Sequence, residues 1–397
     1  MRSTHTVFSI LAAFLVTACD PASESESPAE DGAARTYVEL LGTDTMAIER
    51  FSADAERLEG TLVVRAPVTE VHTYEADLDG EGGVTRLAGT VSVPEANAGA
   101  RPNRSYEYVA RGDSADILAI SGSDTTRATV ELPAGALPIP PRVPAPPSFM
   151  ELATGRLAAG AAEAPLSFVD AASGRSIPSG LVARGADTVA IIYFGSPLLI
   201  TRSEDGKIQQ ISGRESTMRT ETGPAAGSLD VESLAGDYAA RDAAGTGIGV
   251  PSPADTARAS VAGSELEVAY SQPAMRGRAI WGGLVPFGET WRTGANAATA
   301  FRTTADIRVG DTAVPAGEYT LWTLFTEDGA ELIINSQTGQ WGTAYDEAQD
   351  FARVPMEMEA APEAYERFTI GVEGDAAGGR LTLSWDDRTY FVPIAPG

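Results

Sequence analysis

Short runs in which apolar and polar residues alternate recur through residues 36–235. In one of them Glu107 stands between Tyr106 and Tyr108, so both aromatic rings fall on the same side of an extended chain. Segments rich in Gly, Asp and Ser, such as 79–83 and 203–207, connect the runs as turns do. The pattern predicts antiparallel β structure, with strands within residues 45–51, 60–65, 84–93, 105–110, 117–120, 189–194, 198–201 and 208–211.

One helix is expected among these strands. Ser148 and Glu151 have the spacing of a capping box, and Leu152, Ala153 and Leu157 follow at helical spacing. We therefore expect a long antiparallel sheet curled over one helix. Two interpretations of its inner side stay open. It holds either a core filled by side chains or a cavity, and with a cavity it would resemble the periplasmic carriers of lipoproteins and lipids.

The last part of the chain, residues 263–397, shows the same alternation. Val268 and Tyr270 fall on one side of a strand and Glu267 on the other. The adjacent Asp386 and Asp387 are expected to form the turn of a hairpin. Together with the Gly and Pro turns between them, the runs predict a β-sandwich of about 130 residues, with further strands within 318–325, 332–335, 368–372, 381–385 and 390–394.

The distribution of tryptophan marks a domain boundary. All five tryptophans lie after residue 270, and residues 236–262 are small, polar and rich in Pro and Gly, as linkers are. Residues 21–35 contain Ser, Glu, Pro, Ala and Gly without an apolar period, which is typical of a disordered tether. The predicted organisation is a signal peptide (1–18), a tether (19–35), an antiparallel β domain (36–235), a linker (236–262) and a β-sandwich (263–397).

The first residues resemble the signal peptide of bacterial lipoproteins. Arg2 precedes an apolar run over residues 7–16, which ends in small residues before Cys19. The run is too short to span a bilayer. The resemblance implies cleavage before Cys19 and lipidation of its thiol, so the protein is expected in the bacterial cell envelope, anchored to a membrane by acyl chains. A plain signal peptide that happens to end in cysteine is the alternative.

Charge and residue usage exclude several classes of function. The formal net charge is −26, which disfavours nucleic acid as a partner and leaves acyl chains, not a basic patch, to attach the protein to a membrane. Cys19 is the only cysteine, and His72 is the only histidine outside the signal peptide. Disulfides, a thiol nucleophile and a multi-histidine zinc site are thereby excluded, and His72 is interpreted as an ordinary sheet residue. We expect no metal, no cofactor and no catalytic residue.

The motifs of the last third of the chain resemble the bacterial domain-of-unknown-function family DUF2911. They follow one another in order at residues 270–273, 276–278, 280–288, 291–299, 315–321, 334–335, 339–345 and 350–354. The family has no established activity, so the resemblance implies a domain and no mechanism.

A ligand site is predicted in the long irregular passage 273–296 and the loops near it. Arginine offers a fork for carboxylate or phosphate, tryptophan a stacking face, and asparagine hydrogen bonds to a sugar or peptide. In the competing interpretation these residues satisfy loop carbonyls and fill the ends of the sandwich. The candidate ligand-binding residues are Arg276, Arg278, Trp291, Arg292, Asn296, Asn335, Trp341 and Tyr345.

Three functions from different classes are compatible with these features. The first is non-catalytic binding of an extracytoplasmic ligand (a glycan, a peptide or a lipid) or of a partner by a lipid-anchored envelope protein. The second is a carrier or sensor of amphiphiles that uses the first domain. The third is a hydrolase that uses two carboxylates, for which Asp346, Glu347 and Asp350 are candidates.

Overall fold

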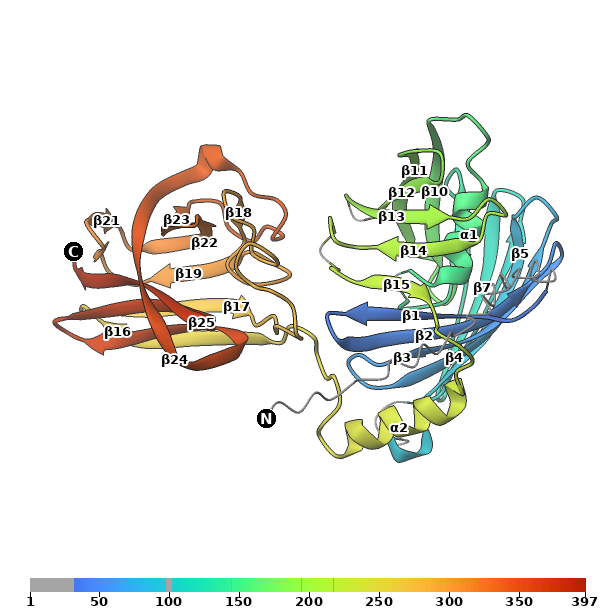
Figure 1. The fold of residues 1–397 in the computed structure, drawn as a ribbon, viewed down its shortest axis with the longest axis horizontal. Helices are drawn as coiled ribbons and strands as arrows, with labels where there is room; N and C mark the ends of the chain where they lie inside the picture. Colours follow the sequence, from blue (N-terminus) through green and yellow to red (C-terminus); the bar gives the residue numbers. More distant parts are fainter. Residues whose placement is uncertain (1–31, 98–101, 144, 194, 217) are drawn as a thin grey trace, which may run out of the picture.

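The computed structural model describes residues 32–97, 102–143, 145–193, 195–216 and 218–397 of the 397-residue chain. The predicted signal peptide, Cys19 and most of the predicted tether lie outside the described residues. The described chain folds into two large, mainly antiparallel sheets that lie side by side in Figure 1, with two α-helices. Within the described ranges neither helix is long and apolar enough to cross a membrane.

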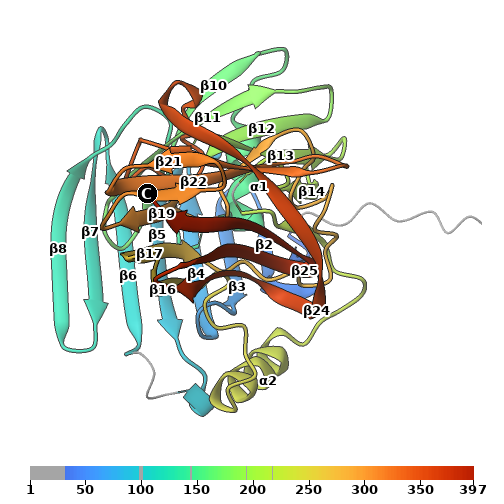
Figure 2. The same ribbon diagram turned by 90° about the vertical axis from the view of Figure 1, so that its left-hand side faces the viewer.

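The first sheet has fifteen strands in the order β8-β7-β6-β5-β4-β3-β2-β1-β15-β14-β13-β12-β11-β10-β9, and β8 forms the free edge at the left of Figure 2. All neighbours pair antiparallel except β9 and β10. The strands are β1 (Arg35–Leu41), β2 (Asp44–Ala53), β3 (Arg57–Val64), β4 (Glu70–Leu78), β5 (Val84–Ser92), β6 (Arg104–Arg111), β7 (Ser114–Ser121), β8 (Asp124–Glu131), β9 (Ala136–Ile139), β10 (Glu163–Asp170), β11 (Ser176–Ala183), β12 (Thr188–Tyr193), β13 (Ser196–Arg202), β14 (Ile208–Ser212) and β15 (Glu221–Pro224).

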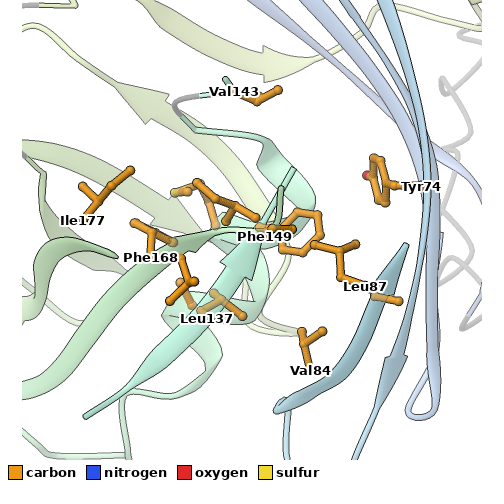
Figure 3. Close-up of a cluster of buried hydrophobic side chains, with 14 of the residues drawn as sticks. Tyr74, Val84, Leu87, Leu137, Val143, Phe149, Phe168 and Ile177 are labelled. Carbon is orange, nitrogen blue, oxygen red and sulfur yellow. The ribbon is translucent and has the colours of Figure 1, made fainter. Parts of the chain in front are cut away.

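Helix α1 (Pro147–Gly155) lies on the inner side of this curved sheet (Figure 1). Its side chains Phe149, Met150 and Ala153 are fully buried, and Phe149 projects toward Leu87 of β5 (Figure 3). Burial of these apolar groups from helix and strands together forms the first core. The predicted curled antiparallel sheet with one helix is thus confirmed.

The start of α1 differs from the predicted capping box. Pro146 is the N-cap residue and makes no side-chain cap. Glu49 of β2 instead accepts a hydrogen bond from the backbone N–H of Ser148 (2.9 Å), while Glu151 pairs with Arg35 (2.6 Å). One free N–H group of the helix start is therefore satisfied by a strand distant in sequence, because the helix end is buried against the sheet.

Helix α2 (Val231–Ala243) packs on the outer side of the first sheet. Val231, Ala235 and Tyr238 contact Ile48 and Val63 there, at the spacing of one helix face. The predicted linker 236–262 therefore contains the second half of α2 and all of β16 (Ala254–Val261). Small residues that resemble a linker form a helix here because the sheet covers their apolar side. A short 3-10 turn, η1 (Glu95–Asn97), lies near α2.

The second sheet has ten strands, ordered β16-β17-β19-β22-β23-β24-β25-β20-β21, with β18 added beside β22. The far half of the β24–β25 hairpin bends back over β16, where Ala262 donates to the Asp375 carbonyl (2.7 Å), and so encloses the second core. The elements are β17 (Ser264–Ser271), β18 (Thr290–Trp291), β19 (Thr299–Thr303), β20 (Ile307–Val309), β21 (Thr312–Val314), β22 (Gly317–Phe325), β23 (Ala330–Asn335), η2 (Glu347–Gln349), β24 (Asp350–Asp375) and β25 (Gly378–Pro396).

The prediction of a hairpin turn at Asp386 and Asp387 is wrong. Both residues lie inside β25, and the chain turns between Asp375 and Gly378. Asp386 has φ +52° and pairs with Tyr365 where the β24–β25 register shifts. The polar step marks an irregularity at which the long hairpin bends, a role that bulges commonly have.

Candidate functional site

The two sheets meet where the β1–β2 turn docks against the loop after β17. The backbone N–H of Thr43 donates to the Arg276 carbonyl (2.9 Å), and the Arg276 guanidinium pairs with Asp44. Gly42 has φ +63°, and a Cβ there would lie 2.1 Å from the Arg276 carbonyl oxygen. Glycine is therefore required at this position, and Arg276 serves as a clasp between the two sheets.

A cavity of about 450 Å³ lies beside this clasp, which we call the intersheet cavity. Its walls come from both halves of the chain. Leu41, Met218 and Arg219 belong to the first, and the second contributes the predicted Arg276, Arg278, Trp291, Arg292, Asn296 and Tyr345, together with Trp322 and Trp385. Clefts that combine apolar walls with a few converging polar groups are the usual form of small-ligand sites.

Arg292 follows β18 and projects into this cavity. Among the residues that the structure describes, none accepts a hydrogen bond from its guanidinium or forms an ion pair with it. Burial, and then the positive charge of Arg219, lowers the pKa of Arg292 to about 10. The side chain is still cationic at neutral pH, so it is a half-buried charge without a counterion.

Two further arginines reach the same cavity. Burial lowers the pKa of Arg278, and the nearby Arg276 and Arg219 lower it further. Its Nε and Nη2 donate to the carbonyls of Met275 (2.9 Å) and Ala274 (2.6 Å). Burial also lowers the pKa of Arg219, with Glu289 acting in the opposite direction. Arg219, from the β14–β15 connection, therefore adds a positive charge from the first sheet to those of Arg276, Arg278 and Arg292.

Backbone packing positions the Arg292 side chain. The N–H of Gly342 donates to the Asn296 carbonyl (2.9 Å), and a Cβ at Gly342 would lie 2.4 Å from the Arg292 Cδ. The main chain thus lies directly against the aliphatic part of Arg292. Three lining residues, Arg219, Arg276 and Asn296, also have positive φ angles of 55°, 49° and 63°. Such conformations carry strain and are frequent at ligand sites.

The remaining predicted residues have structural contacts. Trp291 is buried and stacks on Trp385 at 5.7 Å between ring centroids. Asn335 is fully buried and donates to the Asp346 carbonyl (2.9 Å) and to Asp350 (2.9 Å). Trp341 is half exposed, forms an isolated β-bridge with Ala297 and does not line the intersheet cavity. These residues therefore fit the competing interpretation, in which they make structural contacts within the domain. Arg292 does not fit it, because its guanidinium has no partner in the described chain.

The candidate carboxylates form a network of their own. Asp350 accepts hydrogen bonds from Asn335, Tyr345 (2.7 Å) and Arg353 (2.8 Å), and Glu347 accepts one from Arg353 (3.0 Å). Asp346 caps η2 through the Ala348 N–H. Burial, and then the hydrogen bond to Asp350, raises the pKa of the Tyr345 hydroxyl to about 12. Within the described segments, no group of three or more His, Cys, Asp or Glu residues is placed to hold a metal ion.

His72 lies in the first core, away from the intersheet cavity. Its side chain is 1% exposed, and burial lowers its pKa to about 4. It is therefore neutral at physiological pH, its Nε2 lies 3.8 Å from the Glu70 carboxylate, and it belongs to β4, in keeping with the interpretation as a sheet residue.

Comparison with known proteins identifies one part of the chain. Residues 252–394 match the family model described as protein of unknown function (DUF2911), which confirms the predicted resemblance of the C-terminal part. No curated protein matches the chain. Among the solved structures, the crystal structure of a DUF1089 family protein from Pseudomonas aeruginosa matches with 17% identity and a TM-score of 0.31, over 44% of this chain and 93% of that one.

Proposed function

We propose that this protein binds a small anionic ligand in the intersheet cavity, without catalysis, and that Arg292 is the principal charge partner of that ligand. The observation that carries the proposal is the Arg292 guanidinium, which is half-buried, cationic and without a partner in the described chain. Removing a charge from water is costly unless an opposite charge or good hydrogen bonds compensate. A carboxylate or phosphate oxygen between the arginines would provide both.

The other two functions expected from sequence have less support in the described residues. A carrier of amphiphiles needs space between α1 and the first sheet, where large side chains such as Phe149 lie. The void beside Glu49 at the start of α1 measures about 10 Å³, which is scarcely enough for one water molecule. A cavity of about 820 Å³ does lie against β2–β6, but charged side chains such as Arg50, Glu59 and Glu75 line it, and these do not suit an acyl chain. A carboxylate-dependent hydrolase needs two free carboxyls across a cleft, and Asp350 and Glu347 are engaged by Arg353.

Replacement of Arg292 by glutamine tests the proposal. We expect the full-length protein to bind sulfate and acetate at low ionic strength, and Arg292→Gln to weaken both at least tenfold, because hydrogen bonds to charged groups contribute about 1.5–3 kcal/mol. The change in tryptophan fluorescence on titration measures binding, since Trp291, Trp322 and Trp385 line the cavity.

The matched control is Arg302→Gln on β19, where the arginine side chain is 58% exposed. It removes the same charge from the surface of the same sheet, and we expect its anion affinity to stay within about twofold of wild type, because exposed charges are well screened. Equal weakening in the two variants, or no anion binding by the wild type, would contradict the proposal.

We further propose that Cys19 carries the lipid that anchors the protein in the cell envelope, on the basis of the N-terminal sequence. Replacing Cys19 by alanine is expected to move the protein from the membrane fraction to the soluble fraction, because an acidic chain has no electrostatic attraction to anionic headgroups. Fractionation and phase separation in Triton X-114 measure this. Ser23→Ala in the tether is the control, and continued membrane association of Cys19→Ala would refute the anchor.

A further inference from the structure

We infer that the intersheet cavity selects tetrahedral dianions of the phosphate monoester class over monocarboxylates, and that Arg219, contributed by the first sheet, determines this selection. The inference rests on the proposed function and deepens it. It follows from the number of arginines at the cavity, from the different elements that supply them and from the state of their hydrogen-bond donors.

Besides Arg276, which pairs with Asp44, three arginines line the cavity, and they come from three separate elements. Arg292 follows β18, Arg278 lies in the loop after β17, and Arg219 reaches over from the β14–β15 connection. A carboxylate is planar and accepts one fork on its two oxygens, whereas a phosphate monoester has three terminal oxygens that diverge from one atom. Guanidinium groups from three different elements therefore match the three diverging oxygens of a phosphate monoester better than the two oxygens of a planar carboxylate.

The three arginines differ in how many of their N–H groups already donate hydrogen bonds to the protein. Arg278 is held in place by two loop carbonyls, whereas Arg219 and Arg292 form no hydrogen bond or ion pair with any residue of the described chain. Arg278 is thus fixed before a ligand arrives, which lowers the entropic cost of binding. The guanidinium forks of Arg219 and Arg292 remain available to a ligand.

The charge balance at the cavity favours two negative charges over one. The positive charge of Arg219 lowers the pKa of both Arg278 and Arg292, so Arg219 and each of these two arginines repel each other. Of the carboxylates nearby, Asp44 pairs with the Arg276 guanidinium, Glu366 accepts a hydrogen bond from the Arg276 backbone N–H, and Glu215 and Glu289 are exposed. A dianion offsets this repulsion more completely than a monoanion does.

Apolar residues line the same cavity and suit the organic part of an ester. Leu41 and Met218 come from the first half of the chain, and Leu284 and Val250 from the second. Val250 is 52% exposed, so an apolar group placed against it would remove water from its side chain. An organic monoester uses both the cationic and the apolar wall, whereas inorganic phosphate uses only the first.

Three ligands with one phenyl ring separate charge from shape. Phenyl phosphate is a tetrahedral dianion at pH 8, benzenesulfonate a tetrahedral monoanion, and benzoate a planar monoanion. We expect the full-length wild type to bind phenyl phosphate at least tenfold more tightly than the other two. Below about pH 6 the phosphate gains a proton and that margin should shrink, while benzenesulfonate binding stays constant.

The variant Arg219→Gln is expected to weaken phenyl phosphate binding at least tenfold and the binding of the two monoanions by a clearly smaller factor, so that the preference for phenyl phosphate is lost. Arg219→Lys retains the charge without the fork and should keep part of the preference. Thermal unfolding of each variant shows whether it is folded.

Equal affinity of the wild type for all three ligands, or an equal loss for all three in Arg219→Gln, would overturn the inference and leave the proposed function standing. Binding of none of them by the wild type would instead refute the proposed function itself. The two failures are therefore distinguishable in one set of titrations.

Discussion

The Phe149→Ala variant is expected to lower the free energy of unfolding of the first sheet by about 3–5 kcal/mol, because it removes a large side chain from a core that cannot close around the gap. Phe149 is 0% exposed, and its ring lies 5.5 Å from that of Tyr74. Helix α1 is held on the inner side of the sheet through this and neighbouring side chains (Figure 3). Chemical denaturation, followed by circular dichroism, measures the loss.

Two comparisons make this prediction specific. Phe149→Leu keeps most of the volume and should cost less than about 1.5 kcal/mol. Phe351→Ala removes the same ring from a position on β24 that is 45% exposed, and we expect it to cost under about 1 kcal/mol. If Phe149→Ala cost no more than Phe351→Ala, the placement of α1 against the inner side of the sheet would be refuted.

The second large effect concerns Glu49, whose carboxyl is 1% exposed at the start of α1. Burial raises the pKa of Glu49 from its ordinary value of 4.5 to about 7, although hydrogen bonds from Tyr74 (2.6 Å) and Ser148 act in the opposite direction. Glutamine has no charge to bury, so we expect the free energy of unfolding of Glu49→Gln to rise relative to that of wild type as the pH rises. The total gain should be roughly 3 kcal/mol, because each unit of pKa shift corresponds to about 1.4 kcal/mol.

The sign follows from the protons bound in each state. Below pH 4.5 the carboxyl of Glu49 is protonated in both the folded and the unfolded protein, so its contribution to stability is fully present. Between 4.5 and about 7 it is ionised mainly in the unfolded protein, and stability falls with rising pH. Above about 7 the folded carboxyl is ionised as well, and the loss is complete.

Glutamine can replace the protonated carboxyl of Glu49 without leaving a donor unpaired. Its oxygen can accept from the Ser148 N–H, and its amide can donate to the hydroxyls of Ser148 or Tyr74. Glu59→Gln, which removes a charge from an exposed position on β3, is the control. Denaturant unfolding at pH 4, 6 and 8 measures the difference, and identical pH profiles for the two variants would contradict the buried state of Glu49.

The alternation of apolar and polar residues was enough to predict the β architecture. Tyr106 and Tyr108 beside Glu107 indicate a strand with one buried side, and in the structure both tyrosines are buried in β6. Such a pattern is local, because successive residues of a strand point to opposite sides. The helix at Phe149 could be predicted for the same reason, since its apolar residues recur at helical spacing.

Contacts between distant segments could not be predicted in this way. Residues 236–243 look like a linker, yet they continue α2, since Ile48 and Val63 cover its apolar side. Asp386 and Asp387 look like a turn, yet they lie at a bend within β25, because β24 continues as their partner beyond them. In each case a partner from elsewhere in the chain decides the local conformation.

The candidate site also has features that the sequence predicts and features that depend on contacts between distant segments. From the sequence alone we could predict two mainly antiparallel β parts and an arginine- and tryptophan-rich loop at residues 273–296, because strand period and loop composition are local properties. The contacts of these candidate residues required the tertiary structure. Arg276 pairs with Asp44 and Asn335 donates a hydrogen bond to Asp350, whereas Arg292 has no partner in the described chain. The tertiary structure also added Arg219 to the site, since the docking of one sheet on the other brings together charges more than seventy residues apart, and no local pattern encodes that proximity.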